Sequence, residues 1–236
     1  MSAQTSEYAS PAFVLLTDRL IIVPTPIAIS VPLYRKLYAS LHASPAFCEM
    51  AFSHHFPAVT WNDQQTYEVI HTRDVVRCWA KRGLGDFAVG VRPKDEVLGG
   101  SRRVIEGSSP ACTIVELSSP TALNDVEWAG YAGVRNAITT SLPDQEPNDP
   151  PLPPWQEMIE LRYGVAQDYW GKGLAREAAE AVMQWAVSER GIKKFIAETE
   201  KTNPRSGRVL EKMGFRMSGT TYWKEPTEDE WERVAI

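Results

Sequence analysis

A loop with two glycines separates a strand-forming run from a helix-forming run in the last third of the chain. The stretch reads QDYWGKGLAREA over residues 167–178. The first N–H groups of a helix lack partners and carry partial positive charge, so they bind anions. Gly171 and Gly173 let the backbone turn tightly and approach a ligand, and Lys172 adds a charge at the rim. The pattern predicts a phosphate-binding loop, while a plain strand-to-helix turn is the alternative.

Two common phosphate-binding motifs do not fit this loop. The sequence has no GxxxxGK[ST] segment, which excludes a P-loop. Arg176 occupies the third glycine position of the dinucleotide motif GxGxxG, and only about seventy residues follow the strand before the loop. That remainder is too short for the other strands of a doubly wound sheet, so a dinucleotide site is disfavoured.

Three residues near the loop have side chains suited to proton transfer or ligand contact. Glu160 lies on an expected strand, MIELRYGV over residues 158–165, whose alternating apolar residues indicate one buried face. Asn203 is the expected cap of a helix that carries Ser206 in its first turn. The alternatives are an ion-paired or solvated Glu160 and simple helix-start roles for Asn203 and Ser206.

The segments ELRYGVAQDYWGKGLAREA and TEKTNPRSGRVLEKMGF resemble the GNAT superfamily of N-acetyltransferases, specifically its RimJ/RimL-like branch. TDRLIIVP near the N-terminus resembles the opening strand of that branch. The clear resemblance covers residues 158–220, and a weaker one covers residues 15–107. It implies an α/β (α+β) fold with a mixed, strongly twisted central sheet flanked by helices on both faces.

The resemblance also implies which residues bind acetyl-CoA as a co-substrate. The superfamily loop Q/R-x-x-G-x-G/A holds the diphosphate, and Asp168 stands here at the Gln/Arg position. The end of the preceding strand is expected to pair with the pantetheine arm. The donor-binding residues implied by the resemblance are Val165, Trp170, Gly171, Lys172, Gly173, Leu174, Ala175 and Asn203.

The same resemblance implies direct transfer of the acetyl group to a primary amine, on a protein N-terminus or a small molecule. Glu160 is the expected general base, with Glu157 in reserve; a free Glu has a pKa of about 4.3, so burial or a relaying water has to help it. Leu210 stands where many members carry a thiolate-protonating tyrosine, so Ser206 is the expected substitute. The alternative function is a CoA-binding regulatory or sensor module without catalytic activity.

Periodicity and turn signals predict the elements around these residues. The N-terminal half is expected to hold two strands within 13–24, helices at 31–42 and 61–81, a hairpin over 86–107 around PKDE, and a strand at 127–138. Thr60 and Asp63 resemble a capping box for the second helix. The C-terminal part is expected to hold a strand at 158–165, a helix at about 174–189, a strand at 193–200, a helix after Asn203 and one or two short strands.

The domain organisation expected from the sequence is simple. Residues 1–11 are small and polar and are expected to form a flexible tail. Residues 12–236 are expected to form a single acetyltransferase domain with a proline-rich insertion at about 108–156. The stretch 141–155 holds six prolines, a density that suits neither a sheet nor a helix interior.

Composition excludes several other classes. A net charge of −5 argues against a nucleic-acid binder, and the apolar runs are too short to span a membrane. The three cysteines are far apart, which does not suit a disulfide framework or a zinc site, so no metal is expected. The N-terminus lacks the pattern of a secretory signal. We expect a cytoplasmic protein that is a monomer or a homodimer.

Overall fold

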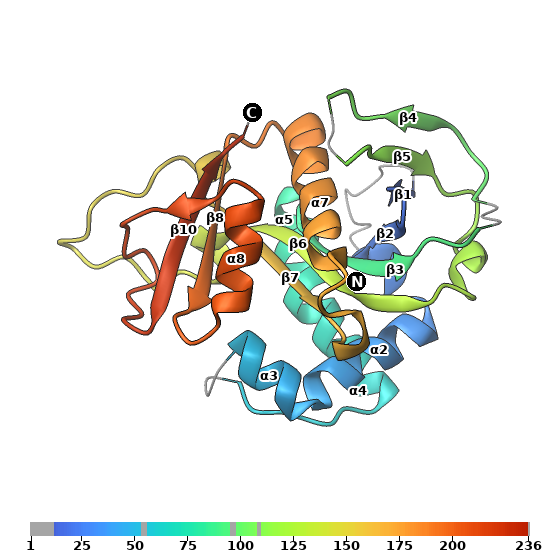
Figure 1. Cartoon of the computed structure of the whole chain (residues 1–236), viewed down its shortest axis with the longest axis horizontal. Coiled ribbons are helices and arrows are strands. Elements are labelled where there is room, and N and C mark those ends of the chain that lie inside the picture. The colour runs from blue at the N-terminus through green and yellow to red at the C-terminus, as the bar shows by residue number, and fades with distance from the viewer. Residues whose placement is uncertain (1–11, 53–55, 95–97, 108–109, 236) are drawn as a thin grey trace, which may run out of the picture.

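A computed structural model describes residues 12–52, 56–94, 98–107 and 110–235. In these residues ten strands form one sheet in the order β4-β5-β1-β2-β3-β6-β7-β8-β10-β9 (Figure 1). The strands are β1 (Phe13–Leu16), β2 (Leu20–Pro24), β3 (Gly85–Val91), β4 (Arg102–Val104), β5 (Thr113–Glu116), β6 (Trp128–Asn136), β7 (Ile159–Val165), β8 (Lys194–Glu200), β9 (Arg216–Met217) and β10 (Glu228–Val234).

Helices cover both faces of this sheet. They are α1 (Thr25–Ala28), α2 (Pro32–Ala43), α3 (Pro45–Phe52), α4 (Asp63–Ile70), α5 (Ala80–Arg82), α6 (Ala137–Thr140), α7 (Leu174–Arg190) and α8 (Pro204–Lys212). On one face the apolar side of α7 packs on Ala132 and Leu161. On the other face Tyr34 of α2 and Ile70 of α4 pack with Ala88. Figure 1 shows α7 and α8 in front of the sheet, so the expected fold class is confirmed.

The strands pair antiparallel throughout except for β7 and β8. These two strands are parallel and are joined by only two residue pairs, Ile159 with Phe195 and Glu160 with Ile196. By contrast, β7 pairs with β6 along its whole length, from Ile159 to Val165. The sheet therefore opens between β7 and β8 beyond Glu160, which creates the space that the site occupies.

The expected elements around this opening are present. The structure confirms the strand pair about TDR, the helix at 31–42, the strand at 127–138 and the four elements from 158 to 212. Gly191, with a φ of 63°, ends α7 as its pattern predicts.

Two expectations about strand pairing are wrong. The hairpin over 86–107 does not form, because β3 lies between β2 and β6 whereas β4 pairs with β5. The segment 108–156 is not one insertion either, since β5 and β6 lie within it and belong to the sheet. Outside the sheet lie the connection from 117 to 127, with the short helix η2 (Pro120–Leu123), and the stretch from 137 to 158, with α6, a proline-rich connection and the short helix η3 (Trp155–Glu157). The expected tail at 1–11 lies outside the described residues.

The second long helix also differs in detail from its prediction. Its cap is Asn62 rather than Thr60: the Asn62 side chain accepts from the Gln65 N–H, and the Gln65 side chain accepts from the Asn62 N–H. The helix is α-helical only to Ile70 and continues as the π-helical segment η1 (His71–Trp79) before α5. Asp74 and Trp79 of η1 are thereby buried next to β3. Among the helices that the structure describes, none combines the length and apolar character that crossing a bilayer requires.

The aromatic contacts between β1, β3 and α7 generate a stability prediction. The indole of Trp185 on α7 is stacked on Phe13 at 5.7 Å between centroids and lies edge-on to Phe87 at 5.0 Å. Trp185→Ala should lower the free energy of unfolding by about 3–5 kcal/mol, because a cavity replaces a fully buried ring. Urea denaturation measures this loss, and Trp185→Phe should recover part of it; a loss below about 1 kcal/mol would contradict the packing described.

Candidate active site

The loop before α7 has the backbone that an anion site needs. Gly171 and Gly173 have φ values of 74° and 77°, a region that side chains other than glycine rarely adopt. Gly173 is the N-cap of α7 and provides no side-chain hydrogen bond to the helix. The first N–H groups of a 17-residue helix therefore remain available to a ligand at the positive end of its dipole.

The N-terminal strand pair fixes this loop in place. Arg19, in the turn between β1 and β2, donates from Nη1 to the Lys172 carbonyl oxygen at 2.9 Å. Its Nε donates to Glu177 on the first turn of α7 at 2.7 Å, and the Thr17 hydroxyl donates to the same carboxylate at 2.6 Å. The loop and the start of α7 are thus held by residues more than 150 positions away in the sequence.

The opening between β7 and β8 is a cleft of about 1390 Å³. All of the predicted site residues except Lys172 line it: Glu160, Val165, Trp170, Gly171, Gly173, Leu174, Ala175, Asn203 and Ser206. The Lys172 ammonium instead lies over the ring of Tyr169, 5.4 Å from its centroid. Glu157, the reserve base, lies on η3 away from the lining. The structure therefore brings the two segments that carry the resemblance to one cavity.

Trp170 occupies one of the backbone hydrogen-bonding groups at the end of β7. Its indole N–H donates to the Val165 carbonyl oxygen at 2.8 Å, so one backbone group expected to pair with the pantetheine arm already has a partner. The Arg205 guanidinium lies over the same indole at 5.8 Å. Arg205, Arg208 and Lys212 on α8 join Arg176 on α7 along the wall of the cleft, which makes this side of it suited to phosphate.

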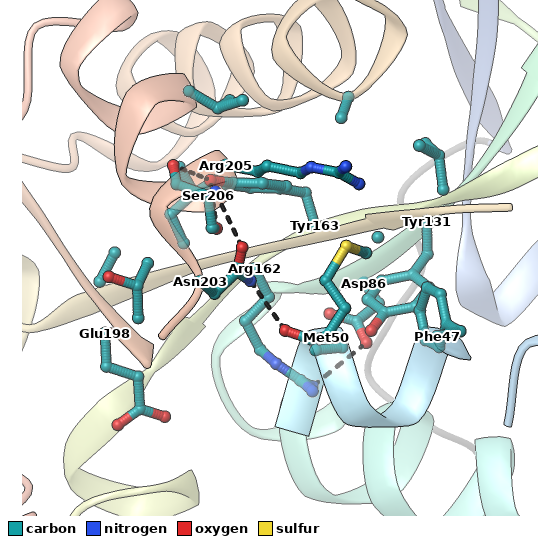
Figure 2. Close-up of a pocket in the computed structure, with 18 of the residues that line it drawn as sticks. Phe47, Met50, Asp86, Tyr131, Arg162, Tyr163, Glu198, Asn203, Arg205 and Ser206 are labelled. Carbon is teal, nitrogen blue, oxygen red and sulfur yellow. Dashed lines mark hydrogen bonds and ion pairs between the residues drawn. The ribbon is translucent and has the colours of Figure 1, made fainter. Parts of the chain in front are cut away.

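The start of α8 is tied across the cleft to α3 (Figure 2). Asn203 caps α8, with its side-chain oxygen accepting from the Ser206 N–H at 3.2 Å. Its amide nitrogen donates to the Met50 carbonyl oxygen of α3 at 2.7 Å. The oxygen and the nitrogen of one side-chain amide therefore cap α8 and connect it to α3.

Ser206 has a partner that the sequence did not reveal. The Tyr163 hydroxyl, on β7, lies 2.9 Å from Ser206 Oγ and donates to the Ser206 carbonyl oxygen at 3.1 Å. Burial raises the pKa of Tyr163 to about 12, so the phenol keeps its proton at neutral pH. A tyrosine hydroxyl thus reaches the first turn of α8 from the sheet, although position 210 of that helix is leucine.

Glu160 lies in a network of buried charges. Its carboxylate accepts from Nε and Nη2 of Arg135, both at 3.0 Å, and from the Ser141 hydroxyl; Arg162 lies 3.6 Å away. Burial alone would raise the pKa of Glu160, but the arginines and Ser141 outweigh it and lower the pKa below its usual range. Arg162 in turn pairs with Asp86 at 3.7 Å. Gly133, between them on β6, makes this possible, because a Cβ there would lie 2.1 Å from an Asp86 carboxylate oxygen.

A second carboxyl lies on the same face of the open sheet. Glu198 follows Ile196, the partner of Glu160, by two residues, so alternation places it on the Glu160 side of β8. Figure 2 shows it at the opposite side of the cleft from Asp86. Burial, followed by a hydrogen bond with Glu228, raises the pKa of Glu198 to about 10. The sequence did not single out Glu198 as an acid or base, because its place on the Glu160 face depends on the register between β7 and β8.

The comparisons with known proteins agree with this geometry. Residues 138–216 match the family model described as an acetyltransferase (GNAT) domain. Two proteins of Bacillus subtilis (strain 168) match part of the chain: YkkB, uncharacterised, is 38% identical over 72 residues, and YnaD, an uncharacterised N-acetyltransferase, is 34% identical over 76 residues. These matches cover 30% and 32% of this chain, and 42% and 45% of the respective relatives, so the chain spans less than half the length of either.

Solved structures match nearly the whole chain. An acetyltransferase from Agrobacterium tumefaciens is 17% identical with a TM-score of 0.59, covering 98% of this chain and 99% of its own. The aminoglycoside acetyltransferase AAC(6')-Ib in complex with coenzyme A is 13% identical with a TM-score of 0.53, covering 94% and 95%. At these identities the likeness shows the fold. The segment 138–216 is therefore similar to the GNAT acetyltransferase domain, and the whole chain shares the fold of these solved structures.

Proposed function

We propose that the protein is an acetyl-CoA-dependent N-acetyltransferase that moves an acetyl group directly to a primary amine. The observation that carries this proposal is the opening between β7 and β8 with the start of α7 and its glycine loop at the mouth. A diphosphate bound at the Gly171–Gly173 loop leaves room for a pantetheine arm to run along the cleft toward Ser206. The matched GNAT domain and the coenzyme A held by AAC(6')-Ib, a protein of the same fold, support this use of the cleft.

In this proposal two sets of side chains handle the protons. Glu160 accepts a proton from the acceptor ammonium, directly or through water, so that the amine nitrogen can attack the thioester carbon. The departing thiolate takes a proton from Ser206 Oγ. Tyr163, 2.9 Å from that oxygen, passes its own proton to Ser206 and regains one from water in the cleft, so that both hydroxyls end the cycle protonated. The positive end of α8 stabilises the thiolate in the meantime.

A second function is favoured by one specific observation, namely that Glu160 is already fully engaged by Arg135 and Ser141. A carboxylate held in this way is a weak base. This suits a sensor or regulatory module that binds CoA at the glycine loop and does not catalyse acetyl transfer. We also propose that the protein belongs to the RimJ/RimL-like branch, on the sequence segments quoted above. The acceptor of the proposed transfer is a protein N-terminus or a small-molecule amine.

Ligand-dependent stability tests the donor site. Acetyl-CoA at one hundred times its Kd should stabilise the fold by ~2.7 kcal/mol, whereas NADH and ATP at equal concentration should leave Tm unchanged. Gly173→Ala should abolish the acetyl-CoA shift, because a side chain at a φ of 77° strains the loop and covers the helix N–H groups.

The matched control is Gly191→Ala, which places the same strain at the other end of α7, at a φ of 63°. Both variants should lose about 1 kcal/mol of stability, but only Gly173→Ala should lose acetyl-CoA binding. Equal acetyl-CoA shifts in the two variants, or a shift with NADH alone, would remove the proposed donor site.

The pH profile of kcat separates the two candidate bases. Because the pKa of Glu160 is lowered, this carboxylate stays ionised from about pH 6 upward and should add no limb to the profile near neutrality. Glu160→Gln should then lower kcat about 100- to 10,000-fold at every pH in that range, with unchanged acetyl-CoA affinity. If kcat instead rises steadily toward pH 10 and Glu198→Gln removes the rise, the base is Glu198, whose pKa is about 10.

Double-mutant kinetics test the Tyr163–Ser206 pair. Ser206→Ala and Tyr163→Phe should each lower kcat, by up to about 100-fold, with little change in the KM for acetyl-CoA. Since the two hydroxyls act in series, the double variant should be no slower than the slower single variant. Fully additive losses would show that the hydroxyls act independently, and unchanged kcat in both would exclude them as proton donors.

A further inference from the structure

Five aromatic side chains line the cleft on the sheet face opposite α7, and we name them the aromatic wall. They are Tyr38 and His42 of α2, Phe47 of α3, Trp61 before α4 and Tyr131 of β6. Tyr131 packs with Phe47, whereas its neighbour Ala132 packs under α7, which places the wall on the opposite face. The predicted donor loop belongs to α7, so the wall lies on the acceptor side.

The rings form one continuous surface. Tyr38 and Trp61 are stacked at 6.3 Å and 17°, and His42 lies 5.1 Å from Trp61. Tyr131 lies 6.3 Å from Tyr38 and 6.5 Å from Phe47. Tyr38, His42 and Trp61 are only half-buried, so their surfaces remain accessible from the cleft.

Gly164 brings this surface up to the point where the sheet opens. A Cβ at Gly164 would lie 2.8 Å from the Phe47 ring and 3.2 Å from the Tyr131 ring. Glycine at this place therefore lets both rings lie directly on β7, next to Val165. Figure 2 shows Phe47 and Tyr131 together on one side of the cleft, away from Ser206 and Asn203.

Positive charges flank the wall. The Arg73 guanidinium lies over Trp61 at 5.9 Å from the ring centroid, and that of Arg162 lies over Tyr131 at 6.0 Å. Burial, together with these two arginines, lowers the pKa of His42 to about 4, so its ring is neutral at neutral pH. The nearby carboxylates of Asp86 and Glu160 are paired with Arg162 and Arg135. A polycation would therefore meet two guanidiniums beside the rings.

The apolar character continues to the mouth of the cleft. Phe56 and Val59 line it and are 59% and 43% exposed. Large apolar side chains with so much exposed surface beside a cavity mark a binding surface for an apolar group.

We propose that the acceptor is a primary amine attached to an aromatic or bulky apolar group, which lies against the aromatic wall. The proposal rests on the acetyl transfer proposed above. The amine nitrogen forms a bond to the acetyl carbonyl carbon and loses one proton, while the carbon–sulfur bond breaks and the thiolate gains one. The flanking arginines also favour the neutral, nucleophilic form of the amine. Such an amine has two sources, a free aryl-alkylamine or the N-terminus of a peptide that begins with an aromatic residue.

Acceptor competition tests this proposal, with release of the CoA thiol as the readout. The probes are tyramine, butylamine, spermidine, kanamycin, and two peptides that differ only in an N-terminal Phe or Ala. We expect kcat/KM for tyramine to exceed that for butylamine by at least about tenfold, with spermidine and kanamycin slower still. If the Phe peptide exceeds the Ala peptide by a similar ratio and tyramine is slow, the source is a peptide N-terminus.

Three variants connect the preference to the wall. Trp61→Ala should lower kcat/KM for tyramine about tenfold more than it lowers that for butylamine. Tyr67→Ala is the matched control, because Tyr67 is an exposed aromatic residue on the neighbouring helix α4 outside the cleft lining. Arg73→Glu should raise the ratio of kcat/KM for spermidine to that for tyramine several-fold. Because Arg73 is exposed, this variant still tests the proposal if Trp61→Ala does not fold.

Calorimetric titration of tyramine into the CoA-bound protein separates this proposal from the proposed function. If no amine is acetylated but tyramine binds, and Trp61→Ala weakens that binding, the aromatic wall stands and acetyl transfer fails. If butylamine, spermidine or kanamycin is acetylated as fast as both tyramine and the Phe peptide, acetyl transfer stands and the preference is overturned. Absence of binding by both tyramine and the Phe peptide also overturns it.

Discussion

The early end of the ladder between β7 and β8 is the constraint on which the rest of the structure depends. Two residue pairs hold these parallel strands together, and beyond them each strand has backbone groups that need other partners. One such group is satisfied inside the chain, by the Trp170 indole on the Val165 carbonyl oxygen. The starts of α7 and α8 both lie at this opening and direct their positive ends toward it. A cavity between two strands of a continuous sheet thus arises without any separate domain having to supply its walls.

Alternating buried charges cross the sheet beside that opening. Arg135 on β6, Glu160 and Arg162 on β7, and Asp86 on β3 form a chain in which each charge has an opposite neighbour. Buried ion pairs of this kind contribute little net stability, because desolvation offsets most of their attraction. What the chain does provide is orientation: it holds the Arg162 guanidinium over Tyr131, and it keeps Glu160 ionised in a buried place. The same residues therefore bear on the acceptor side of the cleft, where Glu160 would take the proton and Arg162 lies over a ring of the aromatic wall.

Local signals in the sequence were sufficient to predict the elements around the donor loop. They did not predict which distant segments pair with one another in the sheet. Gly173, Asn203 and Gly191 act on their own backbone neighbours, so the sequence around each predicted the ends of α7 and the start of α8. The strand β6 was harder to interpret, because nearly all of its residues are buried and it shows no alternation of polar and apolar residues. Glycine is required in this strand by close contacts with residues far away in the sequence. At Gly130, for example, a side chain would collide with the Gly164 carbonyl oxygen. Likewise Arg135 meets Glu160 only through the register of β6 on β7, which no single segment encodes. Ser141 and Tyr163 meet Glu160 and Ser206 through tertiary contacts between elements far apart in the sequence.

The side chain of Asn203 has a consequence for how α3 is held against α8. Its amide nitrogen donates to the Met50 carbonyl oxygen of α3, across the cavity. A single hydrogen bond between such neutral groups is worth about 0.5–1.5 kcal/mol net, which is only one to three times the thermal energy. The bond therefore orients the two helices more than it stabilises the fold. Because the amide oxygen of the same side chain caps α8, a substitution at Asn203 alters the start of that helix and its contact with α3 at the same time.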